Sequence, residues 1–458
     1  MSDYKQRFIS EAAKAISDRK RKIQLQKALS GYSSKNKLAT DQFMNLDLVK
    51  KRAGAIRQRV IENLDKYLIE FESNFNKTNG KLIWAVDSGE ALRKIEEILV
   101  NEGVTSVIKS KSMVTEEIGL NDFLEERGIE TVETDLGEFI QQRSKEPPYH
   151  IVTPCLHKSK TEINELLHSQ LGTPINAGAE EITGVVNQFL RKNFTHSLAG
   201  ITGANFLIAD SGAVAITENE GNAFFSVTSP KIHLAITGIE KILPAAEDLE
   251  LFWPLLASYG TGQKLTTYNH LIRGSKKDNE QGGPEKFYLI LLDNGRSDLL
   301  AKPKQRTSLA CIRCGACYNV CPVYKNIGGH SYNSVYGGPI GKVISPYINQ
   351  NKNLNHLSHA SSLCGACTEV CPVNIPLHQL LLENRKDDSL HLSAGEKLVW
   401  RVWKKAMLNR RVMDRGGSMS KNALLNLFFK NVWGNERLFP KVAKKSFNQI
   451  MRERLKFN

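Results

Sequence analysis

The spacing of hydrophobic residues divides the chain near residue 80. Before that point, apolar residues recur every three or four positions between Phe8 and Ile23, which predicts a helix through Leu29. The polar run 30–37 predicts an interruption, and a second helical pattern extends from Asp47 to Phe71. The chain therefore begins with helices.

From Lys81, short apolar runs alternate with amphipathic stretches of helical length. This alternation is typical of βαβ units and a parallel sheet. Asp210-Ser211-Gly212 is a hairpin signal between two of the later runs. We expect strands over 81–87, 105–110, 129–135, 205–210, 213–218, 232–238 and 287–293, with helices over 88–103, 114–127 and near 178–193.

The remaining sequence has little strand character. Residues 296–310 read as a linker, the cysteine-containing region that follows is compatible with helices, and the last stretch combines basic and aromatic residues. We expect an open α/β domain followed by a helical module. The predicted regions are a basic helical segment over 1–60, an α/β domain over 61–295, a helical ferredoxin-like domain over 296–390 and a basic segment over 391–458.

Composition places the protein among ordinary globular chains. Of its 458 residues, 41% are hydrophobic and 24% are charged. No apolar signal region opens the sequence, so we expect a cytoplasmic protein. The net charge of +14 is unevenly placed: the two basic ends carry +10 and +12, and residues 61–390 carry −8. Such ends permit contact with an acidic partner or loose contact with an anionic membrane surface. We expect no specific nucleic-acid binding.

Seven of the eight cysteines lie between residues 311 and 371. The first motif, CIRCGACYNVCPVY, matches the C-x2-C-x2-C-x3-C-P run of bacterial ferredoxins, in which the fourth cysteine ligates the other cluster. Paired CxxC motifs also bind zinc, but four cysteines in one compact run followed by proline favour iron–sulfur. The first motif consists of Cys311, Cys314, Cys317 and Cys321, followed by Pro322.

The second motif, SSLCGACTEVCPVNIP, lacks one cysteine. Alignment of the two CGAC segments places Ser361 at the position of Cys311. The second cluster is then a [4Fe–4S] cluster completed by Ser361, water or a partner's ligand, or a [3Fe–4S] cluster; distant ligation by Cys155 is less favoured. Crossed ligation gives Cys311, Cys314, Cys317 and Cys371 to the first cluster, and Cys321, Cys364 and Cys367 to the second.

No motif for a two-electron cofactor is present: the sequence has no G-x-G-x-x-G after a strand. Such a cofactor would sit on a partner or in a site that the sequence does not reveal. Polar segments at predicted strand ends, 108–117, 132–138 and 217–222, are placed where α/β sheets bind ligands, although helix capping explains them better. We expect His196 and His233 to pack in the core, and no catalytic residue is assigned.

Several segments together resemble the lactate utilization protein B family: 109–142, 200–222, HSYNSVYGGPIG (330–341) and both cysteine motifs. The resemblance implies an LUD domain followed by a two-cluster module. It further implies that the chain carries electrons while L-lactate is oxidised to pyruvate, together with companion subunits. It assigns the same seven cysteines to the two clusters, and the family also offers only three cysteines to the second.

Two other functions remain open. The chain could itself be the hydroxy-acid dehydrogenase, with substrate in the α/β domain and the segment around Lys111 holding its carboxylate. It could instead be a binding module whose clusters are structural or redox-sensing, with the basic ends holding nucleic acid.

Overall fold

The computed structural model describes residues 3–348, 352–390, 394–413, 415–433 and 438–455. It divides into two compact units, Met1–Asp388 and Ser389–Asn458, which are described separately. The first unit contains every strand in the described residues and all eight cysteines.

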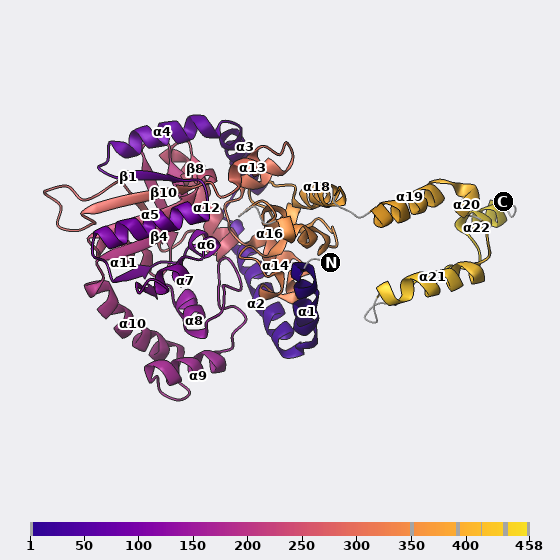
Figure 1. Cartoon of the computed structure of the whole chain (residues 1–458), viewed down its shortest axis with the longest axis horizontal. Coiled ribbons are helices and arrows are strands. Elements are labelled where there is room, and N and C mark those ends of the chain that lie inside the picture. Colours follow the sequence, from indigo (N-terminus) through magenta and orange to yellow (C-terminus); the bar gives the residue numbers. More distant parts are fainter. Residues whose placement is uncertain (1–2, 349–351, 391–393, 414, 434–437, 456–458) are drawn as a thin grey trace. The chain divides into compact units, whose positions relative to one another are not determined.

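A six-stranded parallel sheet forms the centre of the first unit (Figure 1). From β2 the chain moves outward to β3, whereas from β4 it moves the opposite way to β7 and then β10. The strand order therefore reverses between β2 and β4, and the carboxyl ends of such neighbours form a crevice. The order across the sheet is β1 (Lys81–Ala85), β10 (Lys286–Leu292), β7 (Ile232–Gly238), β4 (Ala199–Gly203), β2 (Ser106–Lys109) and β3 (Glu130–Glu133).

A second sheet of four short strands packs beside the first. The predicted hairpin is confirmed: β5 and β6 pair antiparallel, with Ile208 opposite Ala213. Gly212 in the turn has φ +64°, and a Cβ there would stand 2.4 Å from the backbone nitrogen of Phe75, so no other residue fits. The order is β8 (Ile242–Leu243), β5 (Phe206–Ile208), β6 (Ala213–Glu218) and β9 (Tyr268–Ile272).

Helices cover both faces of the parallel sheet (Figure 1). Ile95 and Leu99 of α5 pack with Ile290 on one face, while Phe71 and Phe75 of α4 belong to the core that contains Leu289. The expected helix over 114–127 is interrupted at Gly119, which has φ +66°. The helices of this region are α5 (Ser88–Asn101), α6 (Met113–Glu117), α7 (Leu120–Glu125), α8 (Leu136–Ser144), α9 (Lys160–Leu171), α10 (Ala179–His196), α11 (Asn222–Thr228) and α12 (Leu249–Gly260), with short turns η1 (Ile239–Lys241) and η2 (Ala246–Asp248).

The N-terminal helices pack into the same body. The predicted interruption over 30–37 is wrong, because α2 continues to Thr40. Leu25 and Leu29 of α2 are buried in the core that also contains Phe252 of α12 and Tyr324. These helices are α1 (Asp3–Ser17), α2 (Arg19–Thr40), α3 (Leu46–Glu62) and α4 (Leu64–Asn76).

The cysteine region is helical, as expected, with no strand among its described residues. Residues 296–310 are not the expected linker: Arg296 is fully buried between two carboxylates, and Ser308, Leu309 and Ala310 are buried as well. The elements are α13 (Arg296–Leu300), η3 (Gln305–Ala310), α14 (Ala316–Val320), α15 (Tyr324–Ile327), η4 (His330–Tyr332), α16 (Gly338–Ile344), η6 (Lys352–His359), α17 (Ala366–Glu369) and α18 (Leu377–Ser389).

The second unit consists of helices in its described residues. Trp400 and Trp403 of its first helix contact each other edge to face, and both are more than half exposed. The helices are α19 (Ala394–Leu408), α20 (Arg410–Met413), α21 (Ser418–Trp433) and α22 (Phe447–Leu455). None of the described helices, in either unit, combines the length and apolar character needed to cross a membrane.

Candidate metal centre and the cavity beside it

The first cysteine motif forms a tight loop that ends in α14. Arg313 and Gly315 have φ +60° and +78°, which turns the backbone around the sulfur atoms. The amide of Arg313 donates to Cys311 Sγ at 3.3 Å. A Cβ on Gly315 would lie 3.1 Å from His150, so the loop packs closely against the α/β domain.

The second motif repeats this geometry. Leu363 and Gly365 have φ +55° and +85°, and α17 follows as α14 does in the first motif. The amide of Leu363 donates to Ser361 Oγ at 3.1 Å. The hydroxyl of Ser361 therefore takes the place that the thiol of Cys311 has in the first loop.

One group of thiols combines the two motifs. A small cavity is lined by Cys311, Cys314, Cys317 and Cys371, with apolar residues around them. Burial raises the pKa of Cys317, and the thiols of Cys311, Cys314 and Cys371 raise it further. Cys371 Sγ also accepts a hydrogen bond from the amide of Ile375 at 3.3 Å. The last cysteine of the second motif thus lies with the first three of the first motif.

The other three cysteines form a second group. Burial raises the pKa of Cys367 to about 11, and the Cys321 and Cys364 thiols contribute to that shift. Cys364 is exposed, whereas the other two are buried. The ammonium of Lys342 lies 4.0 Å from Cys321 Sγ and also donates to the carbonyl of Ala360.

The thiols are more widely spaced than the ligands of a single zinc ion. Tetrahedral zinc, with Zn–S bonds of about 2.3 Å, holds its sulfurs about 3.8 Å apart. Among the residues that the structure describes, no three cysteine sulfurs lie within 4.8 Å of one another. Four thiols around one cavity, with amides directed at two of the sulfurs, are a suitable donor set for an iron–sulfur cluster. The second group offers three thiols, with Ser361 at the equivalent fourth position.

The remaining predicted polar residues mostly have structural partners. Lys109 is fully buried and pairs with Glu133 at 2.6 Å, and Ser112 caps α6 by accepting from the Thr115 amide. His233 is buried in the core as expected. The expectation for His196 is wrong, because it is exposed at the end of α10 and its Nδ1 contacts the Lys192 carbonyl.

Cys155 lies near other polar residues of the α/β domain. Burial raises the pKa of its thiol to about 11, and the carboxylate of Asp135 adds to that shift. The nearby ammonium of Lys111 acts in the opposite direction.

A cavity of about 370 Å³ lies between the parallel sheet and the first cysteine loop. On the sheet side it is lined by segments that follow β2, β3, β4 and β7, including Lys111, Asp135 and Lys241. On the other side it is lined by the module that carries the cysteines, including Arg313 and Cys314. The crevice at the strand-order reversal is therefore closed on one side by the cysteine loop.

Three cations near the thiols were not predicted from the sequence: Lys241, Arg313 and Lys342. Arg313 lies within the first motif and Lys342 follows the GGPIG turn, so both were adjacent to recognised signals. Lys241 comes to the site only through the path of the chain after β7, for which the sequence has no local sign.

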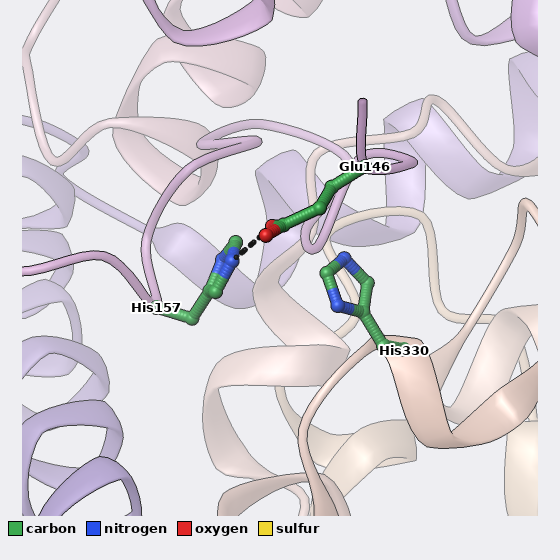
Figure 2. A group of neighbouring side chains, drawn as sticks. All are labelled: Glu146, His157 and His330. Atoms are coloured by element: carbon green, nitrogen blue, oxygen red, sulfur yellow. Dashed lines mark hydrogen bonds and ion pairs between the residues drawn. The ribbon is translucent and has the colours of Figure 1, made fainter. Parts of the chain in front are cut away.

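Glu146, His157 and His330 form a further polar cluster, shown in Figure 2. His157 Nε2 lies 2.9 Å from Glu146 Oε2, and the ammonium of Lys158 binds the other carboxylate oxygen at 2.9 Å. His157 stacks on Tyr149 at 4.3 Å, and His330 meets the same ring edge to face. The cluster therefore joins the loop after α8 to the cysteine module.

Two family models match the chain, an LUD domain over residues 68–292 and a 4Fe-4S dicluster domain over residues 307–375. The fold and the cysteine site thus define an LUD-domain protein with a dicluster iron–sulfur module. Lactate utilization protein B of Bacillus cytotoxicus is 39% identical over 91% of both chains, and that of Bacillus cereus strain B4264 is 37% identical over the same shares. The chain belongs to the lactate utilization protein B family.

A solved structure of a DUF162 family protein from Deinococcus radiodurans aligns with a TM-score of 0.28 and 12% identity. The alignment covers 50% of this chain and 98% of that one.

Proposed function

We propose that this protein carries electrons through two iron–sulfur clusters during the oxidation of L-lactate to pyruvate, acting with companion subunits. Family membership and the dicluster domain support a role in lactate utilization and electron transfer. The observation that supports the more specific proposal is that Cys371 of the second motif lines one small cavity with Cys311, Cys314 and Cys317 of the first.

The proposed ligands of the first cluster are Cys311, Cys314, Cys317 and Cys371; those of the second are Cys321, Cys364 and Cys367. Each bound cluster takes up and releases one electron, so two of them suit the stepwise passage of an electron pair. The amides of Arg313 and Ile375 donate to ligand sulfurs and stabilise their negative charge. The apolar lining of the first cavity excludes water from these sulfurs.

The second site needs a fourth ligand or has one iron fewer. Ser361 is the candidate from this chain, because its hydroxyl is held by the same backbone contact as the thiol of Cys311. We therefore propose either a [4Fe–4S] cluster with an oxygen ligand or a [3Fe–4S] cluster at this position.

Anaerobic iron and sulfide analysis with EPR, before and after reduction, tests the cluster content. About eight irons per chain correspond to two [4Fe–4S] clusters, and about seven to one of each kind. Zinc in place of iron would refute the electron-transfer function.

The substitution Cys314→Ala tests the relay itself. We expect loss of the first cluster's EPR signal and loss of lactate oxidation by the protein together with its companion subunits. Cys155→Ala is the matched control. It should retain the EPR signal and lactate oxidation, because the Cys155 thiol lies near Asp135 and Lys111 and belongs to neither cysteine group. Intact lactate oxidation in Cys314→Ala, despite a missing first cluster, would contradict the proposal.

A further inference from the structure

The cavity between the parallel sheet and the first cysteine loop contains buried cations that lack full pairing. Lys241 is only 6% exposed, and its ammonium makes no hydrogen bond or ion pair with the described residues. Arg313 has one buried guanidinium nitrogen, Nη1, without a partner. An unpaired buried donor is costly, and the cost is larger for a charged group.

The nearby carboxylate is already shared. Glu240 accepts from Arg296 at 2.6 Å, and its other oxygen lies 3.4 Å from Arg313. The fully buried Arg57 is directed at backbone carbonyls, including those of Glu240 and Ile242. Lys241 and Arg313 therefore face the cavity with only the carboxylate of Glu240 beside them, and Arg296 already pairs with that carboxylate, which favours an anionic ligand at this end of the cavity.

Another part of the cavity lining has a different chemistry. Asp135 and Glu220 line it, and burial together with the charge of Asp135 raises the pKa of Glu220 to about 7. A protonated carboxyl group donates a hydrogen bond to a hydroxyl or carbonyl oxygen. A ligand with a carboxylate and a neighbouring hydroxyl or carbonyl oxygen matches both groups of lining residues.

We propose that this cavity binds a small carboxylic acid of the 2-hydroxy or 2-oxo class, with its carboxylate held by Lys241 and Arg313 beside the first cysteine group. The choice of this class rests on the proposed function, whereas the site itself rests on the cavity and its unpaired cations. Cys314 lines the same cavity, so the ligand would lie next to the first cluster.

The thiolates offer another source of negative charge for these cations. Burial lowers the pKa of Lys241 to about 7, and the nearby Cys311 opposes that shift. The pKa of Arg313 is raised despite its burial, and Cys311 contributes most to the rise. If compensation of the cluster's charge were their whole role, removing Lys241 would change the reduction potential of the first cluster and no acid would bind. Binding and potential must therefore be measured on the same samples.

The experiment is anaerobic equilibrium dialysis of the full chain, with both clusters present, against labelled L-lactate and labelled pyruvate. We expect saturable binding of one or both, and at least a tenfold loss of affinity in Lys241→Met, the effect of removing one charged hydrogen bond. Lys231→Met is the control, because that lysine is exposed beyond the opposite end of β7. Iron content and EPR-monitored potentials are recorded for each protein.

A second variant leaves every charge in place. Ala204 lines the cavity after β4, and Ala204→Phe should fill the space, abolish binding and leave iron content unchanged. If Lys241→Met loses its clusters, the Ala204→Phe variant still tests whether the acid binds in this cavity. Absence of saturable binding to the wild-type protein, or unchanged binding in Ala204→Phe, would overturn the proposal.

These outcomes are separate from those that test electron transfer. A protein with two reducible clusters that supports lactate oxidation but binds neither acid would retain the proposed function and refute this site. A protein that binds the acid but lacks redox-active clusters would support this site and refute the proposed function.

Discussion

Ser361 occupies the position in the second cysteine loop that Cys311 occupies in the first, and both side chains accept the amide two residues later. The backbone of the second loop is therefore already shaped to present a ligand there. We expect Ser361→Cys to supply a fourth thiolate to the second cluster. If that cluster has three irons, the variant should gain one iron per chain and lose its [3Fe–4S] EPR signal in the oxidised state.

The neighbouring residue provides the control. Ser362 is exposed, and Ser362→Cys adds the same thiol one position away. It should leave the iron content and EPR spectrum unchanged. An identical change in both variants would show that the position of Ser361 is not special.

Lys342 acts on the second group of thiols through its charge. Its ammonium is buried 4.0 Å from Cys321 Sγ, and the thiols of Cys321 and Cys367 oppose the lowering of its pKa by burial. A positive charge near a cluster stabilises the reduced state. By Coulomb's law, a unit charge 4 Å away contributes about 4 kcal/mol at an effective dielectric constant of about 20, so we expect Lys342→Met to lower the second cluster's potential by up to roughly 180 mV.

EPR-monitored redox titration measures this shift. The first cluster should keep its potential, and Lys386→Met, which removes an exposed charge on α18, should change neither. Equal shifts of both clusters in Lys342→Met would indicate a general structural change in place of a local electrostatic effect.

At the scale of the elements, Tyr149 packs the loop after α8 against the cysteine module. The Tyr324 hydroxyl donates to the Tyr149 carbonyl at 2.6 Å, and a Cβ on Gly329 would lie only 1.8 Å from that oxygen. We expect Gly329→Ala to destabilise the protein by about 1–3 kcal/mol, because backbone would have to move to admit the methyl group.

Urea unfolding followed by circular dichroism measures the effect. Gly184→Ala in α10 is the matched control, since its added methyl group meets no atom within 4 Å and alanine favours the helix. A stability of Gly329→Ala equal to that of the control would show that the loop can separate from the module without cost.

The elements differ in how far local sequence determines them. The apolar runs of β7 and β10 are buried along almost their whole length, and both strands were predicted. β4 was missed because AGITG carries two glycines, yet a Cβ at Gly200 would stand 1.9 Å from the Ser226 carbonyl, so packing requires the glycine. In α2, the hydroxyls of Ser33 and Ser34 donate hydrogen bonds to backbone carbonyls four residues earlier. These bonds allow the polar segment 30–37, which was predicted to interrupt the helix, to remain helical.

The same distinction applies to the candidate site. The two cysteine motifs and the equivalence of Ser361 with Cys311 are local patterns, so they could be read from spacing alone. The cations of the cavity could not, because Lys241 and Arg313 are 72 positions apart and meet only when the module closes over the sheet. Likewise, the partners of Arg296 come from α6 and the turn after β7.

At the scale of the whole molecule, buried histidines make stability depend on pH. Burial lowers the pKa of His233 to about 3, and that of His150 likewise, from an ordinary value of 6.5. Burial also lowers the pKa of His157 to about 4. These groups stay neutral in the folded protein while the unfolded chain takes up protons below pH 6.5. The unfolded state then binds more protons, so the free energy of unfolding falls as the pH falls.

His233 isolates this effect because burial is the cause of its shift and its Nε2 is hydrogen bonded to Thr202 at 2.9 Å. Between pH 7.0 and 5.5, one such group costs about 1.3 kcal/mol of stability. His233→Gln keeps a hydrogen-bonding side chain without that titration, so its stability should fall by about 1.3 kcal/mol less than that of the wild type over this range. Urea unfolding at each pH measures the difference, with His196→Gln, on an exposed residue, as the control. Parallel pH profiles for wild type and His233→Gln would mean that His233 is protonated in the folded protein, contrary to its burial beside Phe287.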